Sequence, residues 1–215
     1  LAVVHMLSGR LDRSRKIVDS IITENRNSSI AFDLRGVIHM KNANFSEAVL
    51  AFDSAIAINP DFALAYYNRA VAKRYLDDPD AMNDLNKAIE IDHDIKHIYF
   101  TRAIIRKENG DLEWALEDYD KAIIYDSSYA DAIYNRAFTL KLLGNYDDAL
   151  KDAELITALE PETPEHWNLK GNIHLLFGDY MMAVNDYDKA LDLQYDYTDA
   201  LLNRGLAYIM NGQPM

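Results

Sequence analysis

Two histidines in the middle of the chain, His93 and His97, could serve as metal ligands. They are four residues apart and are flanked by Asp92 and Asp94, a set that could hold a divalent ion if all four were on one helix. His93, however, falls at a junction between two helical segments, where a turn is expected. We therefore interpret the pair as a turn histidine beside a histidine at a helix start, and we predict no metal site.

The sequence motifs of the main enzyme classes are missing. The chain has no phosphate-binding loop, no dinucleotide-binding glycine pattern and no H-E-x-x-H motif. It has no cysteine, which excludes thiol catalysis, disulfides and thiolate metal sites. Its many carboxylates recur at regular intervals on predicted helices, which is typical of a solvated surface. We therefore predict a protein that is not an enzyme and that needs no cofactor.

Charged residues recur in a pattern that could form ion pairs. A basic residue precedes a small residue at Arg35, Arg69, Arg102, Arg136, Lys170 and Arg204. An acid recurs further along, at Asp84, Asp118, Asp152 and Asp186. We predict the pairs Arg69 with Asp84, Arg102 with Asp118, Arg136 with Asp152, and Lys170 with Asp186. Such pairs would tie one helix to the next, and the alternative is a charged ladder that binds a ligand. The first segment has Ala51 in the place of the acid, which leaves Arg35 for another role.

A second pattern of side chains could bind a peptide. Spacings of four and three residues along predicted helices repeat the order aromatic, apolar, basic. This aromatic stripe consists of Tyr67, Val71 and Arg74, then Phe100, Ile104 and Lys107, then Tyr134, Phe138 and Lys141. Short polar groups that can hydrogen-bond a peptide backbone run beside it, at Asn68, Thr101, Asn135 and Asn203. The alternative is that the rings pack between neighbouring helices, although such packing does not require the three bases.

Small residues recur at a constant spacing along the chain. This spacing defines the helices on which the charged residues and the aromatic stripe lie. One series, in steps of 33 or 34 residues, consists of Gly36, Ala70, Ala103, Ala137, Gly171 and Gly205. A second series keeps the same steps at Ala48, Ala81, Ala115, Ala149 and Ala183. Glycines that can close a helix recur between the two series, at Gly110, Gly144, Gly178 and Gly212. Each copy therefore encodes two antiparallel helices, and such short pairs must stack to bury their apolar faces.

The repeat resembles the tetratricopeptide repeat family. The matching residues are Trp167 to Gly171, Gly178-Asp179-Tyr180 with Ala183, and Asp186 to Ala190. The resemblance implies an all-α, right-handed superhelical solenoid that binds peptides or proteins in a concave groove lined by the first helices. The aromatic stripe and the polar groups beside it then become the candidate partner-binding surface. The carboxylate-clamp subclass of the family is not predicted, because His97 and Thr101 stand where its Lys and Arg would be.

We predict a single array over residues 1–215. Five complete repeats are expected at 29–62, 63–95, 96–129, 130–163 and 164–197, with a partial repeat at 1–28 and a truncated one at 198–215. The second repeat is one residue short, with Asp77 in place of the closing glycine and Pro79 as the expected first residue of its second helix. In the last repeat, cover is expected to be missing over Leu201, Leu202, Leu206 and Ile209. Such uncovered ends suggest a first alternative to a groove-binding scaffold, in which the protein self-assembles through its ends. A second alternative is that the array is the targeting region of a larger enzyme.

The net charge restricts the kind of partner. The chain has 35 acidic and 22 basic residues, for a formal net charge of −13. Such a surface repels phosphate backbones, so we predict no nucleic-acid partner. The longest apolar runs are too short to span a membrane. The bases of the aromatic stripe instead favour a protein or peptide partner with acidic groups, and a chain free of cysteine fits a cytoplasmic or an extracytoplasmic setting.

Overall fold

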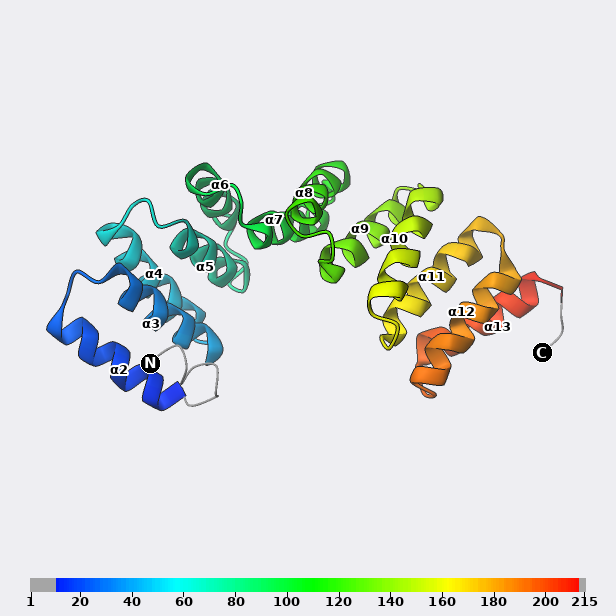
Figure 1. Ribbon diagram of the computed structural model, residues 1–215, viewed down its shortest axis with the longest axis horizontal. Coiled ribbons are helices and arrows are strands. Elements are labelled where there is room, and N and C mark those ends of the chain that lie inside the picture. The colour runs from blue at the N-terminus through cyan, green and yellow to red at the C-terminus, as the bar shows by residue number, and fades with distance from the viewer. Residues whose placement is uncertain (1–10, 213–215) are drawn as a thin grey trace. The chain divides into compact units, whose positions relative to one another are not determined.

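The part of the chain that the structure describes is built of helices and contains no strand. A computed structural model describes residues 11–212 (Figure 1). The helices are α2 (Leu11–Glu24), α3 (Ser29–Lys41), α4 (Phe45–Ile58), α5 (Ala63–Arg74), α6 (Ala81–Ile91), α7 (Lys96–Glu108), α8 (Leu112–Tyr125), α9 (Ala130–Leu142), α10 (Tyr146–Leu159), α11 (Pro164–Phe177), α12 (Tyr180–Leu193) and α13 (Thr198–Met210). The all-α prediction is confirmed for these residues, and none of these helices has the length and apolar character of a membrane span. The predicted partial repeat before residue 11 and the last three residues lie outside the described residues.

Consecutive helices pair as hairpins. A first helix packs on the second helix that follows it, as seen for α3 on α4, α5 on α6, α9 on α10, and α11 on α12. Neighbouring hairpins are joined through α4 with α5, α10 with α11, and α12 with α13. The chain divides into two compact units, one up to Thr101 and one from Arg102 onward. Each unit is a stack of helical hairpins, as the constant spacing of small residues predicted.

A residue with left-handed backbone geometry closes the first helices. The four predicted closing glycines have this geometry, at Gly110, Gly144, Gly178 and Gly212. The amide that follows then bonds back into the helix, as from Asn145 to the carbonyl oxygen of Leu140 at 3.0 Å. In the first two complete repeats Ala43 and Asp77 take this position, with φ values of 57° and 54°. The turn geometry is therefore kept even where glycine is absent.

The second repeat differs from the sequence prediction at its turn. Helix α6 begins at Ala81, so the prediction that Pro79 is its first helical residue is wrong by two positions. Pro79 lies in the turn, where the carboxylate of Asp78 accepts a hydrogen bond from the amide of Asp80 at 2.9 Å. Aspartate is well suited to this kind of turn because its side chain can replace a backbone acceptor. The shortened repeat therefore delays the start of its second helix.

Replacing Ala43 by glycine is expected to stabilise the protein by about 1 kcal/mol. The left-handed backbone at Ala43 brings its Cβ close to a carbonyl oxygen, and glycine adopts the same backbone without this cost. The thermal unfolding midpoint measures the effect. The opposite change, Gly144→Ala, should lower the midpoint by a similar amount. An unchanged or lower midpoint for Ala43→Gly would contradict the assigned turn geometry.

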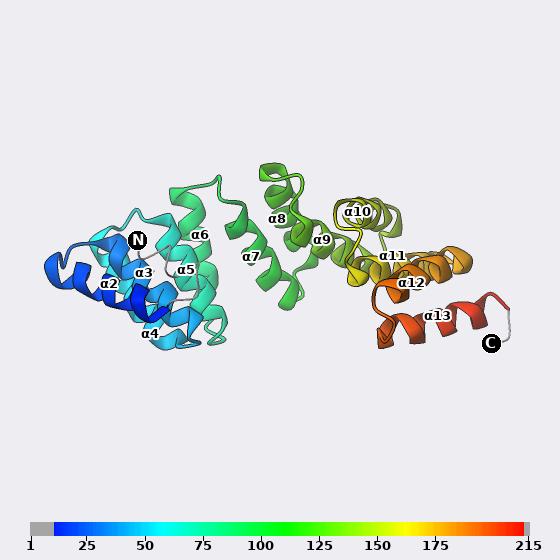
Figure 2. The same cartoon turned by 60° about the horizontal axis from the view of Figure 1, so that its bottom comes forward.

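Small residues of the first helices face large residues of the second helices in the core. Gly36 lies against the ring of Phe52, and a Cβ added at Gly36 would clash with that ring. Gly171 lies against Tyr187 in the same way, with 2.6 Å between an added Cβ and the ring. Figure 2 shows the helices that carry this second contact, α11 and α12, side by side with α13. The glycines are therefore required by close packing between the two helices of a hairpin.

Candidate partner-binding site

The predicted ion pairs form within their hairpins. All four are present: Arg69 with Asp84, Arg102 with Asp118, Arg136 with Asp152, and Lys170 with Asp186. Arg136 donates to Asp152 through two nitrogens, Nε at 2.8 Å and Nη2 at 2.6 Å. The acids of these pairs are buried between the helices. Such two-bond pairs hold a hairpin together, so the structural interpretation is favoured over a ladder for a ligand.

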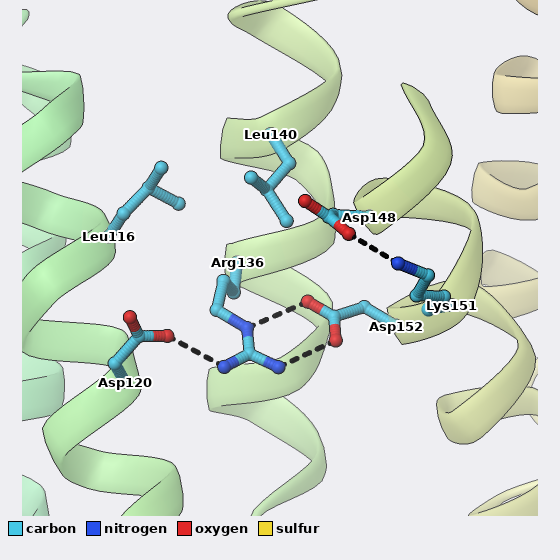
Figure 3. A pocket seen from close by; sticks show the side chains of 7 residues that line it. All are labelled: Leu116, Asp120, Arg136, Leu140, Asp148, Lys151 and Asp152. Atoms are coloured by element: carbon cyan, nitrogen blue, oxygen red, sulfur yellow. Dashed lines mark hydrogen bonds and ion pairs between the residues drawn. The ribbon is translucent and has the colours of Figure 1, made fainter. Parts of the chain in front are cut away.

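Arginines of the first helices also bind an acid of the preceding hairpin, which the sequence analysis missed. These pairs are Arg35 with Asp19, Arg69 with Asp53, Arg136 with Asp120, and Arg204 with Asp188. Figure 3 shows Arg136 between Asp120 of α8 and Asp152 of α10. Each of these acids stands 16 residues before its arginine, and this constant spacing is a signal that could have predicted the pairs. Arg35, whose role the sequence left open, thus links α3 to α2.

Burial and ion pairing shift the pKa of two of these arginines in opposite directions. Burial lowers the pKa of Arg69, but its hydrogen bonds to Asp84 and Asp53 outweigh burial and raise the pKa above its ordinary value. For Arg136 the hydrogen bond to Asp152 is the largest contribution, and its pKa is also raised. Both guanidinium groups therefore stay charged, and the links between hairpins do not depend on pH through the arginines.

A second base meets the buried acid in three repeats. These contacts join Lys73 to Asp84, Arg106 to Asp118, and His174 to Asp186. In the fourth repeat Leu140 takes the position of the second base and lines a hollow of about 400 Å³ (Figure 3). Asp148 and Lys151, at the rim of this hollow, form an ion pair at 2.7 Å. The polar groups around the hollow are therefore already paired with one another.

The two histidines considered as metal ligands lie in different kinds of structure. His93 is in the turn before α7 and His97 is in the first turn of that helix, as the sequence analysis expected. The Nε2 atom of His93 lies 3.4 Å from the carboxylate of Asp94, at the surface. Among residues 11–212, no group of three or more potential metal ligands gathers.

The aromatic stripe of the first unit lines a hollow. Tyr67, Asn68 and Val71 of α5 border a space of about 400 Å³. Its other lining residues come from α3, α4 and the end of α5, and they are Val37, Met40, Lys41, Phe45 and Tyr75. The rings of Phe45 and Tyr75 are stacked, with 4.5 Å between their centroids. Three other predicted site residues are not among the lining residues of this hollow. Arg74 and Phe100 are half-buried, and Thr101 is buried.

Asn68 of the stripe hydrogen-bonds a buried acid of the preceding helix. Its Nδ2 atom donates to the carboxylate of Asp33 at 2.9 Å. Asp33 occupies the position on α3 that aromatic residues take in the next three repeats. Burial raises the pKa of Asp33, and the bond from Asn68 offsets part of that increase. The side-chain nitrogen of Asn68 therefore already has a hydrogen-bond partner within the protein.

The variant Asp33→Asn is expected to stabilise the protein at pH 7 by about 1 kcal/mol, the lower end of the cost of burying a polar group that is not fully compensated. The raised pKa means that the folded chain resists ionisation of this carboxyl, so the cost applies above the ordinary pKa of aspartate and vanishes below it. The gain in thermal midpoint should therefore be present at pH 7 and lost at about pH 3. Asp61→Asn, at an exposed turn aspartate, is the matched control. Equal midpoints for Asp33→Asn and the wild type at pH 7 would refute the prediction.

The aromatic stripe of the second unit is engaged in contacts between repeats. Lys107 of α7 donates to the side-chain oxygen of Asn135 in α9 at 2.7 Å. The ammonium groups of Lys107 and Lys141 lie 5.5 Å and 4.2 Å from the centre of the Phe138 ring. Burial lowers the pKa of Lys141. Ile104 is half-buried on α7. Lys107 thus connects α7 with α9 at the stripe of this unit.

A polar cluster that the sequence analysis missed lies beside Tyr134. The rings of Tyr134 and His166 are 5.5 Å apart, and burial raises the pKa of the Tyr134 hydroxyl. The Nδ1 atom of His166 and the Oδ1 atom of Asn168 are buried and have no hydrogen-bond partner among the described residues. The equivalent positions to His166 hold alanine or isoleucine in the other repeats, so this departure was visible in the sequence.

Sequence comparison identifies the repeat. Profiles described as tetratricopeptide repeat match residues 34–85, 118–151, 139–180 and 165–197, which together cover more than half of the chain. The comparison with curated protein sequences found no match.

Solved structures share this fold at low sequence identity. PilW, a type IV pilus biogenesis factor, is 17% identical with a TM-score of 0.81, over 94% of this chain and 93% of that chain. YrrB, a protein with an unusual peptide-binding site, is 19% identical with a TM-score of 0.75, over 86% of this chain and 96% of that chain. A chain of the Cut9-Hcn1 hetero-tetramer of APC/C is 14% identical with a TM-score of 0.75, over 98% of this chain and 42% of that chain. With its helical hairpins, its repeat spacing and these matches, the chain belongs to the tetratricopeptide repeat family.

Proposed function

We propose that this protein is a scaffold without catalytic activity that binds a peptide or protein partner on the faces of its first helices. The observation that supports this most directly is the hollow of the first unit, where Tyr67, Asn68 and Val71 are all lining residues. It combines aromatic and aliphatic walls with a few polar groups, as binding sites for small apolar groups usually do. YrrB, which has a similar structure, has an unusual peptide-binding site, and this supports a peptide-binding role for the fold.

The lining of this hollow favours a particular partner chemistry. An apolar or aromatic side chain would fill the space between Val37, Val71 and Tyr67, since burial of such a side chain is the main source of affinity. Lys41 is exposed at the edge of the hollow and would attract a neighbouring carboxylate of the partner. We therefore propose a partner segment with an apolar anchor and an adjacent acidic residue. Further proposed contacts are the other stripe residues Arg74, Phe100, Thr101, Ile104, Lys107, Tyr134, Asn135, Phe138 and Lys141.

Val71→Asp is expected to weaken binding of such a segment at least about tenfold. The charge would enter the hollow without a partner and would also repel the acidic residue of the ligand. Peptides can be selected from a random library on the immobilised protein and then measured by fluorescence anisotropy. We expect the selected peptides to share an apolar residue next to an acidic one.

A second pair of variants tests whether the peptides bind in the hollow or adhere to any exposed aromatic residue. Tyr67→Ala removes a wall of the hollow, whereas Tyr195→Ala removes an aromatic side chain that is 85% exposed in a loop of the other unit. Tyr67→Ala should weaken binding and Tyr195→Ala should not. Circular dichroism shows whether both variants remain helical. If the selected peptides bind both hollow variants as tightly as the wild type, the proposed site is wrong.

A further inference from the structure

One oxygen of the buried acid contacts a second base in three repeats. In the third repeat, Oδ2 of Asp118 accepts hydrogen bonds from Nε of Arg102 at 2.8 Å and from Nη1 of Arg106 at 2.7 Å. The same oxygen meets the second base in two other repeats, Asp84 with Lys73 at 3.0 Å and Asp186 with His174 at 2.5 Å. The place in front of this oxygen is therefore a position for a basic group that recurs along the chain.

The fourth repeat keeps the buried acid but lacks the second base. Among the described residues, Oδ2 of Asp152 accepts a hydrogen bond only from Nε of Arg136, at 2.8 Å. Leu140 stands at the position of Arg106, and it belongs to the buried core together with Ala153. Because a carboxylate oxygen has two lone pairs, Oδ2 of Asp152 can accept one more hydrogen bond.

The hollow of the fourth repeat lies where the second base would be (Figure 3). Nη1 of Arg106 bonds the carboxylate of Asp118 at 2.7 Å and the backbone oxygen of Trp114 at 3.0 Å. The residues equivalent to these two acceptors, Asp152 and Asp148, both line the hollow. The other lining residues are Leu116 and Asp120 of α8, Arg136 and Leu140 of α9, and Lys151 of α10. All three helices belong to the second compact unit, so the hollow is complete within it.

We propose that this hollow binds an arginine side chain of a partner protein, which takes the place of the missing second base. Its guanidinium group would donate to Oδ2 of Asp152 and to the carboxylate of Asp148, as Arg106 donates to two acceptors. The apolar side chains of Leu116 and Leu140 would cover its methylene stem. Three aspartates and two bases line the hollow, so an added positive charge would balance the set.

The ion pair at the rim leaves this position accessible. The side chains of Lys151 and Asp148 are 73% and 51% exposed, and an ion pair between such exposed groups contributes little to stability. Lys151 can therefore turn into solvent when a guanidinium group enters. The hollow shares no lining residue with the one that contains Tyr67, and it favours a basic group where that hollow favours an acidic one. It therefore adds a second binding site to the proposed scaffold.

Peptide selection on the Tyr67→Ala variant tests the proposal with the hollow of the first unit disabled. Peptides are selected from a random library on this immobilised variant, labelled, and measured by fluorescence anisotropy. We expect the selected peptides to share an arginine, and replacement of this arginine by glutamine should weaken binding about tenfold. A selection that yields no peptide, or peptides without a shared arginine, would overturn the proposal.

Two pairs of protein variants locate the binding. Leu140→Arg supplies the second base from the chain itself and should weaken binding of the selected peptides about tenfold, whereas Leu142→Arg adds the same charge at an exposed position of α9 and should not. Asp148→Asn removes an acceptor at the rim and should weaken binding about fivefold, whereas Asp147→Asn, beside the hollow but not lining it, should leave binding unchanged. The aspartate pair changes no core residue, so it tests the site even if Leu140→Arg does not fold.

Two results with these variants would contradict the site. Equal binding to Asp148→Asn and Asp147→Asn would overturn it, because the rim acid would then make no contact with the peptide. An equal loss in Leu142→Arg and Leu140→Arg would also overturn it, because general attraction to an acidic protein would then be the cause of binding.

Discussion

Replacing Gly171 by alanine should destabilise the protein by about 3 kcal/mol, the upper end of the cost of overpacking a core. In most helices the change from glycine to alanine stabilises by about 1 kcal/mol, because alanine is the better helix former. At Gly171 the added Cβ would stand 2.6 Å from the ring of Tyr187, and this ring is fully buried. The ring cannot move away without disturbing the core between α11 and α12. The midpoint of thermal unfolding, with the helical signal followed by circular dichroism, measures the loss.

The second repeat suggests how to rescue this variant. Its equivalent positions hold Ala70 and Leu85, an alanine opposite a smaller side chain. The third repeat holds Ala103 and Tyr119 at these positions, so the close approach at Gly171, and not the pair of residue types alone, makes an added Cβ costly there. The double variant Gly171→Ala with Tyr187→Leu should therefore be more stable than Gly171→Ala alone, which is a non-additive effect between residues in contact. Gly205→Ala, at the same repeat position on α13, should be neutral or stabilising, because the described residues include no second helix opposite it. A loss at Gly205 equal to that at Gly171 would mean that the close contact is not the cause.

The hairpins could be predicted from the sequence because a single spacing controls them. Residues such as Ala137 and Ala149 recur every 33 or 34 positions, and each is fully buried. Closing glycines recur with the same spacing and adopt the left-handed backbone that only glycine takes without cost. The start of α6 was missed because Pro79 can begin a helix or lie in a turn, and the neighbouring Asp78 decides between the two by its hydrogen bond.

The candidate site was harder to predict, since it depends on contacts between repeats. The pairs within a hairpin followed from residue types 15 or 16 residues apart. The pair of Arg136 with Asp120 of the preceding hairpin has a similar spacing, but the same arginine was already assigned to Asp152. Side chains of the aromatic stripe are equivalent in sequence but differ in their surroundings. Tyr67 lines a hollow, and Phe138 lies beside two lysines instead. Periodicity fixes which face a residue is on, but not whether a neighbour fills the space in front of it.

Asp118→Ala should destabilise the protein by about 3 kcal/mol, as expected when one partner of a buried ion pair is removed. The carboxylate of Asp118 accepts two hydrogen bonds from Arg102, at 2.8 Å and 2.7 Å, and one from Arg106 at 2.7 Å. Its side chain is 3% exposed, and the two arginine side chains are 15% and 18% exposed. Loss of the acid would leave two positive charges close together in a region that water reaches poorly. Urea denaturation followed by circular dichroism measures the change in stability.

Asp120→Ala, two residues along α8, is the matched control for this prediction. Asp120 also binds an arginine, Arg136 at 2.7 Å, but its side chain is 55% exposed. Water can replace the lost carboxylate there, and Arg136 keeps its two bonds to Asp152, so the cost should stay below about 1 kcal/mol. Each variant removes one aspartate from the same helix, so both change the charge equally. The difference between their free energies of unfolding therefore measures the effect of burial. Similar losses for Asp118→Ala and Asp120→Ala would show that the buried pair adds nothing beyond an exposed one.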